Sequence, residues 1–310
     1  MRHLRLFPEK TRINFVRYRH IAVTLSVIVM VAAFVMLFTH GLNFGIDFRG
    51  GVTIEVTTPG EADVAAMRTQ VSGLGLGEVQ IQEIGTTGRD VLIRVGQEKD
   101  VASNENEIIV AKIKAELGDE VEYRRVEIVG PQVSGELVMA GVQAVVIALA
   151  LMFVYIWFRF EWQFGAGAIL SLAHDVLATI LVFSFFQIQF DLATIAAILT
   201  VVGYSMNDKV VVFDRVRENL RKYKKMDLGE LIDLSINETM SRTLMTAATT
   251  LIALFALFIF GGEVIRTFTF AMIFGVFVGT YSSIYVGTPV LMAIGVNRDW
   301  SAPAKSAKTA

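Results

Sequence analysis

Three polar residues interrupt a long apolar stretch, and their chemical types could carry a proton. The stretch begins at Leu192, and Asn207, Asp208 and Lys209 stand in it before apolar residues resume at Val210. A carboxylate at the centre of a membrane helix costs about 2.5–3.5 kcal/mol on insertion scales, so we expect it to have a use. Two interpretations are open: Asp208 belongs to a proton or ion relay, or both charges lie near the helix end and reach water.

Other polar groups could take part in the same chemistry. Asp175 lies near the middle of another apolar stretch and is a second candidate for a buried carboxylate. Helical spacing places Tyr204 and Ser205 on the same face as Asp208, and two hydroxyls beside a carboxylate could hold or conduct a proton. Lys209 is rotated by about 100° from Asp208 around a helix, so these two residues need not pair.

A basic residue, Arg242, stands at the inner edge of a later apolar stretch. It could anchor the helix by extending its charged group to the membrane surface, as long basic side chains do at helix ends. Alternatively, its charge could stabilise the Asp208 carboxylate or compete with the proton for it. The sequence alone leaves both roles open.

The composition excludes several kinds of chemistry. The 310 residues include no cysteine, so disulfides, thiolate metal sites and cysteine nucleophiles are ruled out. The four histidines are scattered without metal-ligand spacing, and no P-loop motif for nucleotide phosphates occurs. The formal net charge of −2 gives no indication of a nucleic-acid partner. We therefore predict a protein that is not an enzyme and that needs no cofactor or metal.

The apolar stretches predict a membrane protein. Hydrophobic residues make up 54% of the chain and charged residues 19%, whereas about a quarter of residues are charged in soluble domains. Six stretches are long enough to cross a membrane, at about 21–38, 137–158, 164–186, 192–213, 243–260 and 268–294. The sixth is interrupted by Pro289, which predicts a kink. It also carries a row of small residues that would let another helix approach closely: Gly275, Gly279, Ser283 and Gly287.

A segment of mixed composition separates the first two apolar stretches. Alternating apolar residues predict strands at 52–56, 79–84, 91–95 and 121–129, with helices at 61–71 and 103–117. This β-α-β-β-α-β order is that of a ferredoxin-like α+β domain, with a four-stranded antiparallel sheet and two helices on one face. Its charged residues are spread over several faces, so binding or mechanical work is expected of it rather than catalysis.

The distribution of basic residues predicts the orientation in the membrane. Lys and Arg are concentrated before the first apolar stretch and between the fourth and fifth, whereas the loops at 187–189 and 261–266 hold one Arg between them. The predicted organisation has five parts. A cytoplasmic segment covers 1–19, a first membrane helix 20–39 and an external ferredoxin-like domain 40–135. Five further membrane helices cover 136–295, with a basic cytoplasmic loop at about 214–242, and a cytoplasmic tail covers 296–310.

Several motifs resemble one known family. The most specific is VGYSMNDKVVVFDRVREN at 202–219, and shorter matches occur at 13–15, 43–51, 174–176, 237–239, 241–243 and 260–262. In these motifs the chain resembles the SecF family, the smaller subunits of the SecD–SecF accessory complex of the bacterial protein translocase, within the RND superfamily. The resemblance implies a polytopic α-helical membrane protein with six transmembrane helices of RND type and one external ferredoxin-like domain.

The resemblance also implies a function and its residues. It implies that the proton-motive force promotes late steps of protein export in the bacterial inner membrane. The implied partners are SecD, the SecYEG channel, other accessory subunits of the translocase and an unfolded polypeptide in transit. In this family the residues that match Asp208 and Arg242 are tied to proton movement. Further candidates for the relay are Asn207, Asp175, Tyr204 and Ser205. The family motif at the inner end of the fourth helix also includes Asp214 and Arg215.

Two positions depart from the family pattern. Lys209 stands where a small hydroxyl residue is usual, and Arg49 where Thr is frequent. Lys209 could pair with Asp208 or be solvated at the helix end. Two other functions remain open: half of an RND-type exporter of small molecules or lipids, which the small external domain argues against, and a scaffold subunit that transports nothing and holds Asp208 in a static ion pair.

Overall fold

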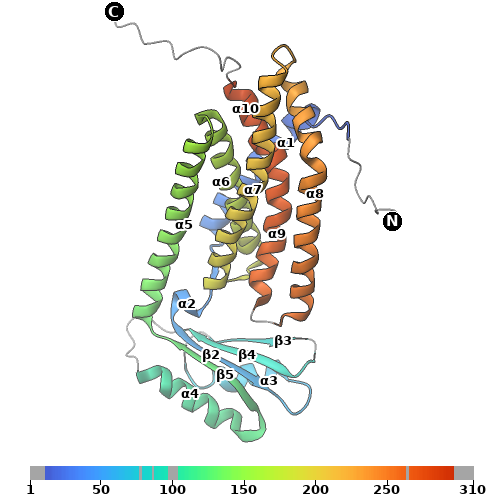
Figure 1. Ribbon diagram of the computed structural model, residues 1–310. Coiled ribbons are helices and arrows are strands. Elements are labelled where there is room, and N and C mark those ends of the chain that lie inside the picture. The colour runs from blue at the N-terminus through green and yellow to red at the C-terminus, as the bar shows by residue number, and fades with distance from the viewer. Residues whose placement is uncertain (1–10, 77–78, 86, 97–103, 263–264, 297–310) are drawn as a thin grey trace, which may run out of the picture.

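The computed structural model describes residues 11–76, 79–85, 87–96, 104–262 and 265–296. Figure 1 shows a bundle of long helices with an α/β domain at one end. Six helical segments of the described chain are long and apolar enough to cross a membrane, as the sequence predicts. They are α1 (Arg19–Thr39), α5 (Pro131–Arg159), α6 (Trp162–Phe186), α7 (Leu192–Lys222), α8 (Leu228–Phe260), and a sixth made of α9 (Arg266–Ser282), a π-helical turn (Ser283–Gly287) and α10 (Thr288–Ile294).

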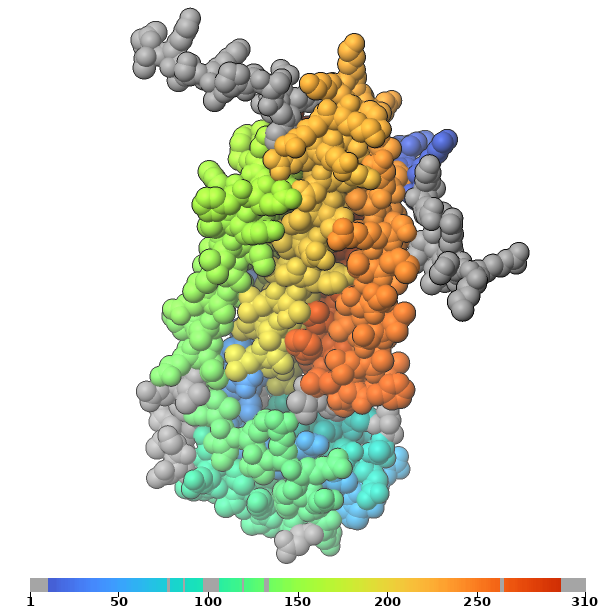
Figure 2. All heavy atoms as spheres, in the orientation of Figure 1, coloured from blue at the N-terminus to red at the C-terminus, as the bar shows by residue number. Residues whose placement is uncertain are grey.

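Helix α7 lies at the centre of the bundle. It packs against α6, α8 and α9, and half of its most apolar window is buried. Helix α5 is peripheral by the same measure, since only 6% of its window is buried, and it forms one edge of the molecule in Figure 2. The side chains of α7 that face α6, α8 and α9 are therefore shielded from the surroundings.

Close contact between α7 and the sixth membrane segment depends on glycines. A Cβ atom at Gly275 would lie 2.2 Å from Val201 Cγ2, and one at Gly279 would lie 2.8 Å from Ser205 Oγ. The next small residue that faces α7 is Gly287, where a Cβ would lie 3.1 Å from Phe213 Cζ. The row of small residues predicted from the sequence thus faces α7 and lets the two backbones approach each other.

The predicted break in the sixth segment takes the form of a π-helical turn. The turn covers Ser283–Gly287 and ends two residues before Pro289. Proline has no N–H to donate to the preceding turn, and π-helical turns inside α-helices are frequent at functional sites. The turn follows Ser282, whose side chain belongs to the polar core described below.

The basic segment between the fourth and fifth membrane helices, where the sequence predicts a cytoplasmic loop at about 214–242, is mostly helical. Helix α7 continues to Lys222 and α8 begins at Leu228, which leaves residues 223–227 as the connection. Beneath the charged surface, Val216 and Leu220 of α7 pack in one apolar cluster with residues of α8 such as Leu231. This buried periodic stripe, rather than the charge of the segment, determined its structure.

The domain has the β-α-β-β-α-β order expected from the sequence. Its elements are β2 (Gly51–Thr57), α3 (Val64–Ser72), β3 (Val79–Ile84), β4 (Asp90–Gly96), α4 (Asn104–Leu117) and β5 (Glu122–Val129). The antiparallel sheet has the order β3-β4-β2-β5. Both helices cover the face of the sheet that points away from the bundle, so the other face lies toward the bundle (Figure 1).

The root of the domain is joined to the bundle by elements that the sequence did not predict. Strand β1 (Asn43–Phe44) pairs in parallel with β6 (Gln189–Phe190), which connects α6 to α7. The single-turn helix α2 (Ile46–Arg49) follows β1 and leads into the sheet. At that point Gly51 has φ = 134°, and a Cβ there would lie 2.2 Å from a carbonyl oxygen of β4, so only glycine fits.

Candidate functional site in the helical bundle

Asp208 is a buried carboxylate between α7 and α8. Its side-chain atom Oδ1 accepts a hydrogen bond from Thr243 Oγ1 of α8 at 2.5 Å, and the residue is 8% exposed. Ser283 of the π-helical turn lies beside it. The other carboxylate oxygen, Oδ2, is buried and has no hydrogen-bond partner among the described residues. One oxygen of this carboxylate is therefore positioned but unpaired, which suits it to receive a proton.

Lys209 forms a buried ion pair with Asp175, and both predicted environments for this lysine are wrong. Both side chains are 0% exposed, and Lys209 Nζ lies 2.9 Å from Asp175 Oδ2 of α6. The same ammonium group donates to Ser282 Oγ at 3.1 Å and to Ser205 Oγ. A buried charge is tolerated when it is paired and hydrogen-bonded. The lysine reaches α6 and α9 because it is rotated by about 100° from Asp208 around α7.

The hydroxyls expected near Asp208 have other neighbours. Ser205 donates to Asp175 Oδ2 at 2.6 Å, so it belongs to the Lys209–Asp175 pair. Tyr204 is half-buried beside Thr250 of α8. The structure thus divides the expected cluster into two sites on adjacent faces of α7, one with Asp208 toward α8 and one with Asp175 of α6.

His174 is packed inside the bundle next to the ion pair. Its Nδ1 atom lies 3.4 Å from Asp175 Oδ1, and its ring faces the ring of Tyr281 at a centroid distance of 6.0 Å. Tyr281 in turn donates to the Ala22 carbonyl of α1 at 3.0 Å. His174 therefore connects the charged pair to the contact between α9 and α1.

Two further predicted residues of the relay are exposed in this chain. Asn207 lies on the outer side of α7, and Arg242 lies on the outer side of α8. Arg242 directly precedes Thr243, the partner of Asp208, yet no ion pair joins Arg242 to Asp208 among the described residues. The contact predicted for Arg242 is thus made by its neighbour Thr243.

The two residues of the family motif at the inner end of α7 make surface ion pairs. Asp214 binds Arg159 of α5 at 2.7 Å, and Arg215 binds Glu238 of α8 at 2.9 Å. These pairs lie at the end of the bundle far from the domain (Figure 1). They connect α7 to its two neighbours there and are separate from the buried carboxylates.

Two carboxylates cap the other end of α7. Asp191 accepts a hydrogen bond from the Thr194 amide at 2.7 Å, and Asp47 of α2 accepts one from the Leu192 amide at 3.0 Å. Acidic groups at a helix N-terminus are stabilised by the unpaired amides and the helix dipole. Burial raises the pKa of Asp191, the hydrogen bonds from Thr194 oppose this, and the nearby Asp47 charge adds to the increase. The root of the domain is thus bonded to the helix that carries Asp208.

The sequence analysis missed Thr243, Ser282 and Asp47 as members of these sites. A capping signal was present, because Asp191 precedes Thr194 by three residues at the start of an apolar run. An acidic and a basic residue within membrane segments, Asp175 and Lys209, also invite pairing. Spacing within one helix could not supply the contacts to other helices.

The fold and these buried charges define a class: a polytopic membrane protein whose charged groups resemble those of ion pathways. Comparison with known proteins identifies the family. Residues 109–297 match the family model described as protein export membrane protein SecD/SecF, C-terminal, and residues 35–58 match the SecD/SecF GG motif. The chain belongs to the SecD/SecF family of protein export membrane proteins.

Its full-length relatives are SecF subunits. Protein translocase subunit SecF of Cereibacter sphaeroides is 48% identical over 312 residues, covering 98% of this chain and 96% of that protein. The SecF of Rickettsia rickettsii is 44% identical over 299 residues, with 96% of each chain covered. The chain is therefore a translocase subunit of SecF type.

Solved structures of SecDF have the same fold over nearly the whole chain. SecDF from Thermus thermophilus, described as a translocon-associated membrane protein, matches with a TM-score of 0.82 and 35% identity. SecDF in a super-membrane-facing form matches with a TM-score of 0.68 at the same identity. The matches cover 93% and 92% of this chain but 39% of each SecDF chain, so this chain spans about two fifths of a SecDF protein.

Proposed function

We propose that this SecF-type subunit acts with SecD and uses the proton-motive force to promote late steps of protein export through the SecYEG channel. In this proposal the protein lies in the bacterial inner membrane, with both termini in the cytoplasm and the α/β domain in the periplasm. The observation that carries it is the state of Asp208. This carboxylate is buried between two membrane helices, and one of its oxygens has no hydrogen-bond partner in the described structure.

Asp208 is better suited than Asp175 to take up a proton. One oxygen of Asp175 accepts hydrogen bonds from the Lys209 ammonium group and the Ser205 hydroxyl. The positive charge of Lys209 stabilises the ionised form of this carboxylate, so Asp175 is less suited to bind a proton. Among the described residues, Asp208 accepts a hydrogen bond from the neutral Thr243 hydroxyl, with Ser283 beside it, and no ion pair to it is present. A proton at Asp208 would remove a buried charge and change the contact between α7 and α8. The exposed charge of Arg242, one residue from Thr243, would act on Asp208 through space.

The change in the contact between α7 and α8 would be transmitted to the domain through α7. This helix runs without interruption from Leu192 to Asp208, and its first amide is bonded to Asp47 at the root of the domain. Each elementary charge that crosses 100 mV provides about 2.3 kcal/mol. Such an energy shifts the ratio of two conformations by about 50-fold, which is enough to bias two orientations of the domain.

The decisive experiment compares Asp208→Asn with Asp208→Glu. Both are assayed for proton-dependent export in membrane vesicles that contain SecD and SecYEG, and assembly with SecD is checked in the same samples. Asparagine cannot take up a proton, so we expect at least a tenfold loss of the proton-dependent component. Glutamate retains a carboxylate and should preserve part of it. Normal export by the Asp208→Asn variant would disprove the relay.

A scaffold role is the second candidate. It would require Asp208 to serve only as a structural contact, and the Thr243 hydrogen bond is the kind of contact it would use. In that case Asp208→Asn, which can still accept from Thr243, should keep full activity. An exporter of small molecules is less favoured, because the relatives at 44–48% identity are named translocase subunits.

A further inference from the structure

A polar cavity of about 470 Å³ lies between the sheet of the domain and the adjacent end of the bundle. One wall is the face of the sheet opposite to its core. Val52, Ile54 and Val56 point into the domain core, so the residues between them, Thr53 and Glu55, point toward the bundle. The other wall is formed by the domain root and by the connection between α6 and α7, with residues such as Asp47, Gln187, Gln189 and Asp191.

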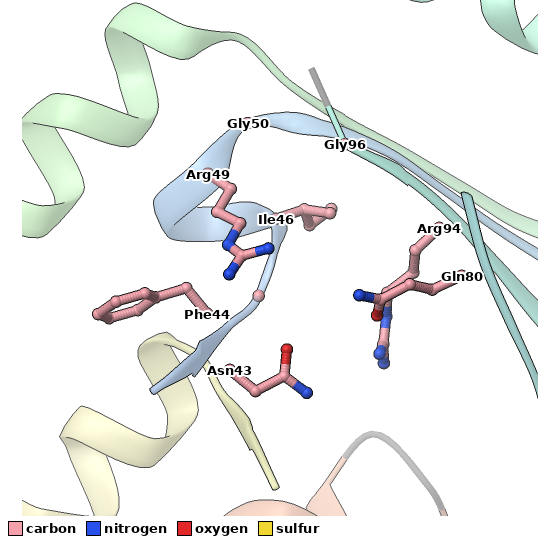
Figure 3. Close-up of a pocket in the computed structure, with 9 residues that line it drawn as sticks. Asn43, Phe44, Ile46, Arg49, Gly50, Gln80, Arg94 and Gly96 are labelled. Atoms are coloured by element: carbon pink, nitrogen blue, oxygen red, sulfur yellow. The ribbon is translucent and has the colours of Figure 1, made fainter. Parts of the chain in front are cut away.

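Two donors on the sheet wall have no acceptor. The Thr53 hydroxyl is buried without a hydrogen-bond partner in the described structure, and the residue is 8% exposed. Arg94 Nε is buried and unpartnered in the same way, and Arg94 also lines the cavity. Figure 3 shows Arg94 and Gln80 projecting from the sheet into a small adjoining pocket. A buried hydrogen-bond donor without an acceptor lowers the stability of the folded protein, so an acceptor oxygen from a bound ligand would stabilise both Thr53 and Arg94.

The cavity also offers acceptors. The carboxylates of Asp47, Glu55 and Asp191 line it, together with Glu127, which pairs with Arg125. An anionic ligand would meet these carboxylates, and a small cation would meet the guanidinium groups of the arginines. Among the described residues, no group of three or more histidine or acidic side chains could hold a metal ion. The lining therefore fits a ligand that is neutral and carries both donors and acceptors.

A polypeptide main chain has this chemistry. Each residue other than proline supplies one N–H donor and one C=O acceptor. Ligand pockets usually have volumes of about 300–1,000 Å³, and this cavity falls in that range. Apolar side chains in the lining, Ile46, Ile84, Leu92 and Ile188, could contact side chains of the bound segment.

We propose that this cavity holds a short extended segment of the polypeptide in transit, with Thr53 and Arg94 donating hydrogen bonds to its carbonyl oxygens. The inference rests on the proposed function, because it assumes that an exported chain passes the domain. It goes beyond that function by assigning the contact to the bundle-facing side of the sheet. The helices on the other side are not involved.

The absence of cysteine from the chain allows a direct test. The variant Gln82→Cys places a benzophenone-maleimide probe in the cavity, and Lys112→Cys places the same probe on exposed α4, on the far side of the sheet. The polypeptide in transit is an export precursor that is stalled by a folded carboxyl-terminal domain, in vesicles with SecD and SecYEG. We expect photo-crosslinks to the precursor from Gln82→Cys to exceed those from Lys112→Cys at least fivefold.

A second variant tests the hydrogen bond itself. Thr53→Val keeps the shape of the side chain and removes a hydroxyl that has no partner in the free protein. It should therefore fold normally and should reduce the crosslink from Gln82→Cys by about threefold to tenfold, the effect of one net hydrogen bond. An unchanged crosslink would contradict a role for Thr53.

The outcomes separate this inference from the proposed function. Equal crosslinking at both positions, crosslinks to SecD or lipid instead of the precursor, or no crosslink would overturn the inference. Because the precursor is stalled, crosslinking does not depend on proton-driven movement. A missing crosslink together with loss of export in Asp208→Asn would leave the proton relay intact. A strong crosslink together with normal export in Asp208→Asn would support polypeptide binding in the cavity and would disprove the proton relay.

Discussion

At the scale of single residues, the Lys209–Asp175 pair distinguishes the two buried carboxylates of the bundle, because only Asp175 has a buried cation as its partner among the described residues. Both members are fully buried, and their contact joins α7 to α6. Removing one partner of a buried ion pair leaves an uncompensated charge, whereas removing both charges is often nearly neutral. The charges of Lys209 and Asp175 therefore compensate each other, whereas Asp208 Oδ2 has no hydrogen-bond partner among the described residues.

This arrangement leads to a prediction about stability. Lys209→Met should destabilise the protein by about 3–5 kcal/mol, because it strands the Asp175 carboxylate. The double variant Lys209→Met with Asp175→Asn should recover most of that loss. Thermal unfolding of the purified protein in detergent measures both. If the single variant is as stable as the double variant, the charge of Asp175 is compensated by some other group.

The sequence identified the polar residues of the bundle but not their partners. Asp208 and Asp175 were recognisable because each interrupts an apolar stretch. The neighbours of Asp208 were predicted by helical spacing, which correctly places Ser205 near its face but does not say which helix lies against that face. Ser205 in fact points to Asp175 of α6, 30 residues away in the chain. Contacts between helices depend on the packing of the whole bundle, and one sequence does not encode them in any local pattern.

At the scale of elements, the beginning of α7 is sensitive to pH through Asp191. Burial is the main cause that raises the pKa of this carboxyl in the folded protein. The folded state then binds the proton more tightly than the unfolded state, whose pKa is about 3.9. Its contribution to stability is complete below that value and is lost as pH rises from there through the folded pKa.

Two substitutions at this position separate capping from titration. Asp191→Asn keeps an N-cap and cannot titrate, so it should remove this part of the decline in melting temperature as pH rises above about 4. Asp191→Ala should in addition cost about 1 kcal/mol, because the hydrogen bond to the Thr194 amide is lost. Melting curves recorded across pH measure both effects. A decline of the same size in Asp191→Asn would assign the titration to another group.

The contact between α7 and α9 can be tested with two glycines. Gly275→Ala should destabilise the protein by about 1–3 kcal/mol, because its Cβ would overlap Val201. Val201→Ala in the same chain should restore part of the stability. The matched control is Gly203→Ala, where nothing lies within 4 Å, so that alanine should be neutral or slightly stabilising in the isolated protein. Equal effects of the two alanines on unfolding would contradict the observed helix contact.

Strand and helix positions were largely predictable because each has a period and a boundary signal. The strands of the domain alternate along the chain, and the membrane segments have the required length. The parallel pairing of β1 with β6 could not be predicted, because each strand has only two residues and they are far apart in sequence. The helical structure of the long basic segment was not predicted, because its charges were considered without the apolar stripe beneath them.

At the scale of the whole molecule, one face of the bundle is polar and uncovered. Thr200, Gly203 and Asn207 lie on the outer side of α7, next to exposed polar residues of α8 that include Arg242 and Thr246. In Figure 2 the surfaces of α7 (yellow) and α8 (orange) lie side by side on the face toward the viewer. Polar groups are costly against lipid, so a protein partner is expected there. The SecDF structures suggest SecD for this role, because this chain spans only about two fifths of them.

The expected partner contact can be tested by adding bulk at a position that is empty in the isolated chain. Gly203→Leu should leave folding unaffected, since no atom of the chain lies within 4 Å of that Cβ. Copurification with SecD should fall at least fivefold. Val27→Leu, on the exposed side of α1, serves as the control and should copurify normally. Undiminished assembly of Gly203→Leu would place SecD on another face.

Different contacts hold α7 to each of its neighbours, and at its far end the Arg215–Glu238 ion pair and an apolar cluster join it to α8. Close glycine contacts fix α7 to α9, the buried ion pair fixes it to α6, and Asp47 fixes it to the root of the domain. The link between Asp208 and α8 is a single hydrogen bond from Thr243. In the proposed mechanism, titration of Asp208 would change this contact between α7 and α8, and the root of the domain would move with α7. The 16 residue-to-residue steps from Leu192 to Asp208 span about 24 Å, so a tilt of α7 by about 5° at Asp208 would displace the root of the domain by about 2 Å.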